Sequence, residues 1–425
     1  MGADIKSILK KLFFVCFLAA SASSAWAGLG EAKAAYQKND YAVAAQEFAS
    51  LAAAGDAEAQ YFLGLMAESG QGRARDLTLA ASWYSKSGKQ GFHLAQYRLG
   101  MAYIGGDGVD ANPQLAAHWL KSAAQAGLPE AQLSLGVLYG RGTGVTRDSR
   151  TAMHWFQLAA DQGNLQALYN LGIAYRDGVG VNQDDKVAVR FFRQAAESGH
   201  VDAQAILGSI YSDGRGVKRD YTEAQKWLRL AANQGSAGAQ TNLGLMFSSG
   251  DGVPKNMPEA VRWLKLAADQ DFPVALYDLG VIYRDDLGSS ADMAEAVRFF
   301  HRAAALGHAQ ANSSLASMYI SGSGVTQDAA EAARWYRKAA ELGISYAQQQ
   351  LGFMYYNGEG VEQNYTQSFL WIRKAAEQDE SRSQWALSRM YMRGQGVEAN
   401  QTEAKKWLVR AAESGYPQAK KDLGM

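Results

Sequence analysis

The sequence predicts an all-α fold, a solenoid of about eleven helix-turn-helix repeats that are each 36 residues long. Three observations support this fold class. A Leu-Gly pair recurs with constant spacing, a Gly-x-Gly-Val motif follows it, and an Asp or Asn stands four residues after the second glycine of that motif. Self-similarity at such a period is typical of stacked repeats that share one continuous core.

The Leu-Gly pair marks the first predicted helix of each repeat. An alanine five residues before the glycine and an aromatic residue three residues after it complete an amphipathic pattern. Because glycine is a poor helix former, we expect it to permit the close approach of a neighbouring helix. The glycines are Gly64, Gly100, Gly136, Gly172, Gly208, Gly244, Gly280, Gly352 and Gly424, and Ala316 and Ser388 take the two remaining slots.

The Gly-x-Gly-Val turn follows the first helix, as at residues 106–109, 142–145, 178–181 and 214–217. Its first glycine can adopt the left-handed conformation that ends a helix, and its second glycine lets the chain reverse. The Asp or Asn side chain that comes next can cap the following helix. We expect these N-caps at Asp40, Asp76, Asn112, Asp148, Asp184, Asp220, Asn256, Asp292, Asp328, Asn364 and Asn400.

The second predicted helix of each repeat carries an aromatic residue, which we expect to supply most of its buried area. These residues are Trp83, Trp119, Trp155, Phe191, Trp227, Trp263, Phe299, Trp335, Trp371 and Trp407. An Ala-Ala pair such as Ala123-Ala124 then permits tight packing, and a glycine such as Gly127 ends the helix.

The combined pattern of alanine, Leu-Gly, tyrosine, Gly-x-Gly-Val, tryptophan and Ala-Ala resembles the Sel1-like repeat family, which is related to the tetratricopeptide repeats. The resemblance covers residues 28–424 in one register. It implies a right-handed superhelix of antiparallel helix pairs. On this reading, residues 28–55 form a degenerate N-terminal capping repeat and residues 56–425 form the repeat solenoid.

Residues 1–27 have the pattern of a secretory signal peptide. Lys6, Lys10 and Lys11 precede an apolar run at residues 12–20, and Ala25-Trp26-Ala27 fits a cleavage site. An uncleaved membrane anchor is the alternative, although the run is short for a bilayer. We expect a periplasmic or secreted protein of a Gram-negative bacterium, with no membrane insertion after cleavage. The only cysteine, Cys16, would be removed, so the mature chain would have no disulfide.

The charge balance gives no indication of nucleic-acid binding. The net charge is zero, and removal of residues 1–27 takes away three lysines and one aspartate, which leaves −2. Basic residues recur two positions after the aromatic residue of the second helix, at Lys121, Arg193, Arg229, Lys265, Arg337 and Arg373. In several repeats another basic residue stands directly before the aromatic residue, and a glutamate stands one helical turn before that basic residue. This spacing favours ion pairs on the helix surface instead of a nucleic-acid groove. The glutamates are Glu223, Glu259, Glu295, Glu331 and Glu403.

The sequence contains only weak patterns for the binding of metals, phosphate or cations. The six histidines show no paired metal-ligand spacing, and His118 and His154 belong on a solvated helix face. The Gly-x-Gly loops follow helices rather than strands, which disfavours phosphate binding. Acidic residues at Asp278, Asp285 and Asp286 could hold a cation, but a remodelled loop at residues 286–289 is the favoured interpretation. We therefore expect no metal and no cofactor.

The candidate binding site lies on the first helices, which line the concave surface in tetratricopeptide-like solenoids. By that analogy, three positions face a groove: three before, one after and four after the Leu-Gly glycine. Tyr, Trp and Arg, which carry much binding energy at protein interfaces, recur there. The candidate partner-binding residues are Tyr97, Met101, Tyr169, Arg176, Tyr277, Arg284, Phe353, Tyr356, Trp385 and Arg389. The alternative is that some of them pack against the next helix pair.

The family resemblance implies a non-enzymatic scaffold that binds a protein segment in the groove. Family members act in envelope assembly, polysaccharide export, signalling and host contact by pathogens, so a host-interaction virulence factor is one alternative. A second is a β-lactam-binding or β-lactam-hydrolysing enzyme like the cysteine-rich branch of the family, which the lack of cysteine in the mature chain disfavours. A third is an adaptor of the eukaryotic endoplasmic reticulum.

Overall fold

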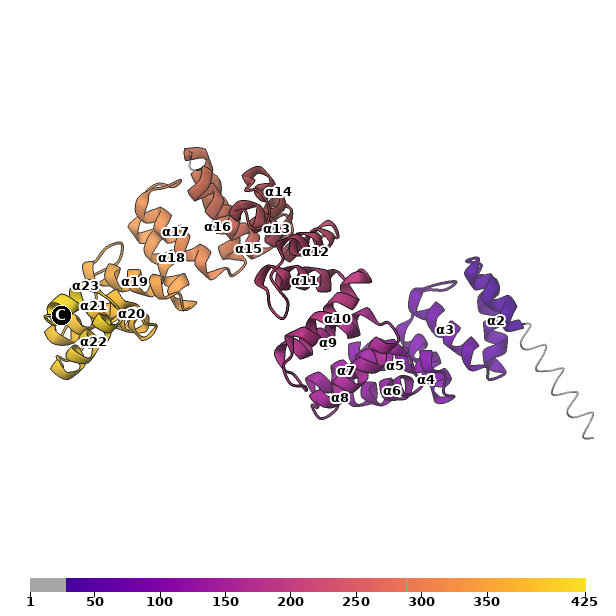
Figure 1. Ribbon diagram of the computed structural model, residues 1–425. Coiled ribbons are helices and arrows are strands. Elements are labelled where there is room, and N and C mark those ends of the chain that lie inside the picture. The colour runs from indigo at the N-terminus through magenta and orange to yellow at the C-terminus, as the bar shows by residue number, and fades with distance from the viewer. Residues whose placement is uncertain (1–27, 288) are drawn as a thin grey trace, which may run out of the picture. The chain divides into compact units, whose positions relative to one another are not determined.

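The computed structural model describes residues 28–287 and 289–425 (Figure 1), and the predicted signal peptide at residues 1–27 lies outside these described residues. Residues 28–37 are helical, and no strand occurs in the described ranges. The first helices of the repeats are α3 (Ala57–Ser69), α5 (His93–Gly105), α7 (Pro129–Arg141), α9 (Leu165–Asp177), α11 (Val201–Asp213), α13 (Ala237–Ser249), α15 (Pro273–Ile282), α17 (Ala309–Ser321), α19 (Ser345–Asn357), α21 (Ser381–Arg393) and α23 (Pro417–Asp422).

The second helices are α2 (Tyr41–Ala53), α4 (Leu77–Lys89), α6 (Pro113–Gln125), α8 (Ser149–Asp161), α10 (Asp185–Glu197), α12 (Tyr221–Asn233), α14 (Met257–Ala268), α16 (Ser290–Ala305), α18 (Ala329–Glu341), α20 (Tyr365–Glu377) and α22 (Gln401–Glu413). A π-helical turn, η1 (Tyr283–Leu287), extends α15. Successive first helices begin 36 residues apart, so the predicted all-α solenoid of helix-turn-helix repeats is confirmed. Among the described helices, none is long and apolar enough to cross a membrane.

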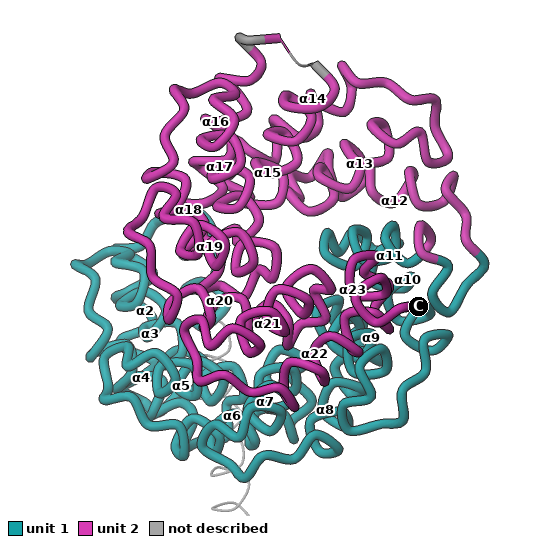
Figure 2. The backbone as a smooth tube through the Cα atoms, turned by 90° about the vertical axis from the view of Figure 1, so that its left-hand side faces the viewer, with its two compact units in different colours: residues 1–210, 214–218 teal, residues 211–213, 219–425 magenta. Residues whose placement is uncertain are grey.

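The chain divides into two compact units (Figure 2). Unit 1 comprises residues 1–210 and 214–218, and unit 2 comprises residues 211–213 and 219–425. Within unit 1, each helix from α2 to α10 packs against the next helix of that series. Within unit 2, each helix from α12 to α23 likewise packs against the next helix of that series. This nearest-neighbour packing is the expected arrangement for stacked repeats.

The helix ends form as the turn motif predicts. Gly106, Gly142, Gly178, Gly214, Gly250, Gly322, Gly358 and Gly394 are left-handed C-caps of the first helices. The predicted N-cap side chains accept backbone N–H bonds at Asp40, Asp76, Asn112, Asp148, Asp184, Asp220, Asn256, Asp328, Asn364 and Asn400. These bonds satisfy N–H groups that have no partner inside the helix.

One predicted N-cap is wrong. The N-cap of α16 is Ser289, whereas Asp292 is the third residue of the helix and completes a capping box with Ser289. The reason is the turn η1, which continues the preceding helix past the point where other repeats end at a glycine. The loop is therefore short and α16 starts early. This confirms the predicted loop remodelling, and no group of three potential metal ligands occurs there or elsewhere in the described ranges.

The Leu-Gly glycine faces the second helix of its own repeat at very short range, as predicted. A Cβ atom on Gly172 would lie 2.6 Å from Cε1 of Phe192, and one on Gly100 would lie 2.7 Å from Cγ of Leu120. Phe192 and Leu120 both follow the aromatic position of the second helix, and both side chains are fully buried. The residue after the aromatic position, rather than the aromatic residue itself, therefore fills the centre of the repeat.

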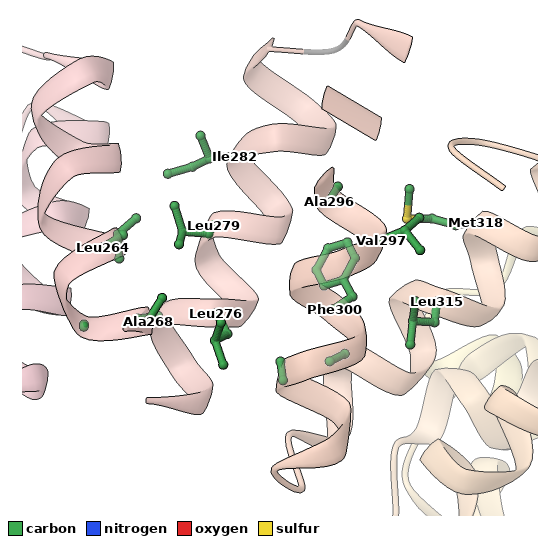
Figure 3. Close-up of a cluster of buried hydrophobic side chains, with 14 residues drawn as sticks. Leu264, Ala268, Leu276, Leu279, Ile282, Ala296, Val297, Phe300, Leu315 and Met318 are labelled. Atoms are coloured by element: carbon green, nitrogen blue, oxygen red, sulfur yellow. The ribbon is translucent and has the colours of Figure 1, made fainter. Parts of the chain in front are cut away.

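The core runs from one repeat into the next within a unit. In unit 2, Leu264 of α14, Leu279 of α15, Phe300 of α16 and Leu315 of α17 belong to one cluster of buried side chains (Figure 3). Each of these four side chains is fully buried. Sharing the core across repeats gives each helix pair the apolar partner that it cannot supply for itself.

Candidate functional site

The four predicted site residues of unit 1 lie in two different repeats. Tyr97 and Met101 belong to α5; Tyr97 packs partly buried against the cluster formed by α6 and α7, and Met101 is exposed. Tyr169 and Arg176 belong to α9. The ring of Tyr169 stacks on His200 with centroids 4.9 Å apart, and Arg176 forms hydrogen bonds of 2.7 and 3.0 Å to Asp177.

Tyr277 and Arg284 of unit 2 also have partners within the chain. Tyr277 stacks on His308 with ring centroids 4.4 Å apart. The guanidinium group of Arg284 donates hydrogen bonds of 2.6 and 2.7 Å to Asp285, which lowers the pKa of that carboxyl group. Burial lowers the pKa of His308 below its usual range, so its ring favours the neutral form.

The remaining four predicted residues converge on one pocket in unit 2. Phe353 and Tyr356 of α19 and Trp385 and Arg389 of α21 line a cavity of about 490 Å³. The two helices are the first helices of consecutive repeats, and α20 packs against both. Phe353 and Arg389 occupy equivalent positions 36 residues apart, so the repeat register itself places them side by side on neighbouring helices.

The aromatic side chains of the pocket are held by polar contacts at their edges. The hydroxyl group of Tyr356 donates a 3.0 Å hydrogen bond to Oε1 of Gln395. Nε1 of Trp385 donates a 2.9 Å bond to Oδ2 of Asp422, and this bond lowers the pKa of the Asp422 carboxyl group. The indole also packs against Tyr416, with ring centroids 5.7 Å apart. These contacts fix the ring orientations before any ligand binds.

Three arginines of α21, namely Arg382, Arg389 and Arg393, line the same pocket. Sequence reasoning identified only Arg389. The sequence does single out Arg382 and Arg389, because no other repeat has an arginine at the position equivalent to either of them. At the register position of Arg393, Arg141 is the single other arginine.

Ser368 of α20 is a further residue that the sequence analysis missed. Its side chain is 0% exposed, it lines the pocket, and its hydroxyl group has no hydrogen-bond partner among the described residues. The signal was again a departure from the repeat, because every other equivalent position, from Ala44 to Ala404, is alanine. Buried polar groups are rarely left unpaired, so this hydroxyl calls for an explanation.

The second helices carry the predicted surface ion pairs. Pairs three residues apart join Glu223 to Lys226, Glu259 to Arg262, Glu295 to Arg298, Glu331 to Arg334 and Glu403 to Lys406. Most of these basic residues are well exposed, so each pair adds only a few tenths of a kcal/mol. His118 and His154 are exposed on the same helix series, as expected.

These features define the class of protein as an α-solenoid built from helical hairpins, with an aromatic and cationic pocket between consecutive repeats. The profile of the Sel1 repeat matches ten consecutive segments, at residues 57–92, 93–128, 129–164, 165–200, 201–236, 237–272, 273–308, 309–344, 345–380 and 381–416. The chain therefore belongs to the Sel1 repeat family. Proteins of this family generally serve as scaffolds that bind protein partners.

Two solved structures agree with this assignment. One is a protective antigen present in uropathogenic Escherichia coli strains, which displays an SLR fold; it is 32% identical, with a TM-score of 0.74 over 95% of this chain and 88% of that chain. Another is a Sel1 repeat protein from Oxalobacter formigenes, which is 29% identical, with a TM-score of 0.52 over 56% of this chain and 96% of that one. Comparison with curated proteins gives no match.

Proposed function

We propose that this protein is a non-enzymatic scaffold that binds a segment of a partner protein on the face predicted to be concave. The observation that carries the proposal is the convergence of Phe353, Tyr356, Trp385 and Arg389 on one pocket. Aromatic residues and arginine are the types that dominate binding energy at protein interfaces. The mechanism is binding alone, with the partner segment held by rings whose orientations are already fixed.

The experiment is affinity capture from a native envelope extract with the full chain as bait. The test variant combines Trp385→Ala with Arg389→Ala in the pocket. The matched control combines Trp371→Ala with Arg373→Ala on α20, since neither residue lines the pocket. A partner that is retained by the wild type and by the control, and lost by the test variant, supports the proposal. Circular dichroism melts verify that all three proteins are folded.

A partner that binds both variants equally would overturn the assignment of this pocket. The comparison with Tyr97→Ala, Tyr169→Ala and Tyr277→Ala would then locate the contact elsewhere on the first helices. Because Tyr169 and Tyr277 stack on His200 and His308, those two variants require the same check of folding.

We also propose that the protein is exported to the periplasm or secreted after cleavage between Ala27 and Gly28. Support comes from the basic residues, the apolar run and the small residues of the first 27 positions. N-terminal sequencing of the protein from fractionated cells tests this. A mature chain that starts at Gly28 supports export, and a chain that retains residues 1–27 in the membrane fraction supports an uncleaved anchor.

A role in host contact is a second candidate function. The observation in its favour is the similarity to the protective antigen of uropathogenic Escherichia coli, which is 32% identical. Surface labelling of intact cells, followed by measurement of adhesion to epithelial cells with and without the gene, tests this candidate. A protein that is inaccessible to the label and has no effect on adhesion would exclude it.

A further inference from the structure

The pocket between α19 and α21 carries an excess of positive charge. Arg382, Arg389 and Arg393 line it together with one carboxylate, that of Glu359. In the described part of the chain, none of the three arginines forms an ion pair. By contrast, Arg176 and Arg284, the other arginines predicted for the binding face, are each paired with the aspartate that follows them.

Two of the three guanidinium groups lie over aromatic rings. Arg382 lies over the ring of Phe353, with its Cζ 4.6 Å from the centroid, and Arg389 lies 6.0 Å from the centroid of Trp385. A guanidinium group attracted to an aromatic ring keeps its charge, and its N–H groups can still bind a carboxylate through two bonds. The rings therefore hold two cations without neutralising them.

The deeper part of the pocket is apolar with one polar atom. Ile372, Ala386 and Met390 contribute its apolar lining, and the unpaired hydroxyl group of Ser368 is buried there. A volume of about 490 Å³ exceeds what a lone inorganic anion would fill and is sufficient for a large side chain with the adjoining backbone. The hydroxyl group would gain a partner from a peptide carbonyl or a phenol group.

We propose that this pocket binds an acidic peptide segment of a partner protein, in which a carboxylate side chain lies next to an aromatic or large aliphatic residue. The carboxylates pair with Arg382, Arg389 and Arg393, and the apolar side chain enters the cavity above Ser368. This inference rests on the proposed scaffold function and specifies the chemistry of its ligand. A nucleic-acid strand fits less well, because Arg382 already lies over the ring of Phe353 and Glu359 would repel phosphate.

The test is a selection from a random dodecapeptide display library on the immobilised full chain. We expect the enriched peptides to contain Asp or Glu within three residues of Phe, Tyr, Trp or Leu. A synthetic, fluorescein-labelled copy of an enriched peptide is then titrated by fluorescence anisotropy. Replacement of its acidic residues by Asn or Gln should weaken binding about tenfold or more, and higher NaCl should weaken binding of the acidic peptide.

Three variants assign the binding to this pocket. Arg389→Gln and Arg393→Gln should each raise the dissociation constant about tenfold, because each loses a charge-assisted bond. Ser368→Ala introduces the residue found in the other repeats, so the fold is retained, and we expect binding to weaken about threefold. Arg373→Gln is the matched control, since Arg373 pairs with Glu377 and lies outside the pocket; it should leave the dissociation constant unchanged.

Several results would overturn the inference while leaving the scaffold function intact. These are enrichment of peptides without acidic residues, failure to enrich any peptide, and tighter binding of a labelled oligothymidylate than of the acidic peptide. Acidic peptides whose binding is indifferent to Arg389→Gln and Arg393→Gln would also overturn it. The scaffold function fails separately, if the capture experiment yields no partner for the wild-type chain.

Discussion

Gly144 lies against the backbone of Pro113, so close that a Cβ atom built on Gly144 would be 2.0 Å from the carbonyl oxygen of Pro113. Gly144 is the second glycine of a Gly-x-Gly-Val turn, and Pro113 begins the second helix of the preceding repeat. The same contact recurs with Gly108 and Leu77, with Gly360 and Ala329, and with Gly396 and Tyr365. The second glycine therefore fixes the spacing of consecutive repeats, in addition to allowing the chain to reverse.

Gly144→Ala should destabilise the protein by about 3 kcal/mol or more, because the new methyl group forces two repeats apart at a backbone with positive φ. Gly163→Ala is the matched control: Gly163 also has positive φ, but a Cβ atom there would meet nothing within 4 Å. We expect the control to cost only about 1 kcal/mol. Urea denaturation followed by circular dichroism measures both. Equal costs would contradict the proposed role of the contact.

Phe192→Ala should cost about 3–5 kcal/mol, because it empties the fully buried site that faces Gly172. Phe191→Ala serves as the comparison within the same helix. Phe191 is partly exposed and stacks on Tyr175, with ring centroids 5.6 Å apart, so its loss should cost about 1–2 kcal/mol. Urea midpoints rank the two variants. If Phe191→Ala lowered the free energy of unfolding more than Phe192→Ala, the residue at the aromatic position would be the main core residue after all.

Ser289→Ala should cost about 1 kcal/mol, because Ser289 and not Asp292 is the N-cap of α16. The comparison is Asp328→Ala at the N-cap of α18, where the turn has its usual form. We expect similar losses from the two variants. Hydrogen exchange of the first turn of α16, measured by mass spectrometry, reports the change locally, and unchanged exchange in Ser289→Ala would contradict the assigned cap.

Asp278 should make the stability of unit 2 depend on pH between about 4 and 6. Burial raises the pKa of its carboxyl group to about 6, and one of its oxygens is buried without a hydrogen-bond partner. The folded state therefore binds the proton more tightly than the unfolded state does. The resulting stabilisation is fully present below the unfolded pKa of 3.8 and is lost as pH rises through about 6.

Asp278→Asn removes this titration. At pH 7.5 the variant should be more stable than the wild type by roughly 1–2 kcal/mol, a value reduced from the full pKa shift because the side chain is partly exposed. The difference should shrink towards zero near pH 4. Thermal melts of the two proteins at several pH values measure this. A difference in melting temperature that does not change with pH would show that Asp278 stays ionised in the folded protein.

Most of the fold follows from local signals in the sequence. Asn112, Asp148 and the other caps could be predicted because capping and glycine-dependent turns involve residues only a few positions apart. Asp292 was misassigned because the π-helical turn η1 depends on how α15 continues, which the spacing of the motif does not encode. Phe192 was undervalued because its burial depends on the helix facing it, and the repeated tryptophan is more conspicuous in the sequence.

The candidate site was only partly visible in the sequence. Register placed Phe353 and Arg389 at equivalent positions, and their residue types suggested binding. Arg382 and Arg393 lie at positions outside the predicted face, yet they line the same pocket. Ser368 lies on a second helix, which the analogy excluded. Tyr277 was predicted on the same basis as Phe353, but it stacks on His308 of its own unit.

The sequence by itself determined the repeat length, the helix-turn-helix unit, nearly all helix ends and the surface ion pairs, because each depends on groups within one or two helical turns. Only the tertiary structure decided which aromatic rings stack on other side chains of the chain and which line a pocket. It also decided that Arg382, Arg389 and Arg393 line the same pocket as the buried Ser368 and form no ion pair within the described part of the chain. Burial and pairing depend on which side chains the adjacent helices bring together. These contacts between helices can be seen only when the packing of the helices is known.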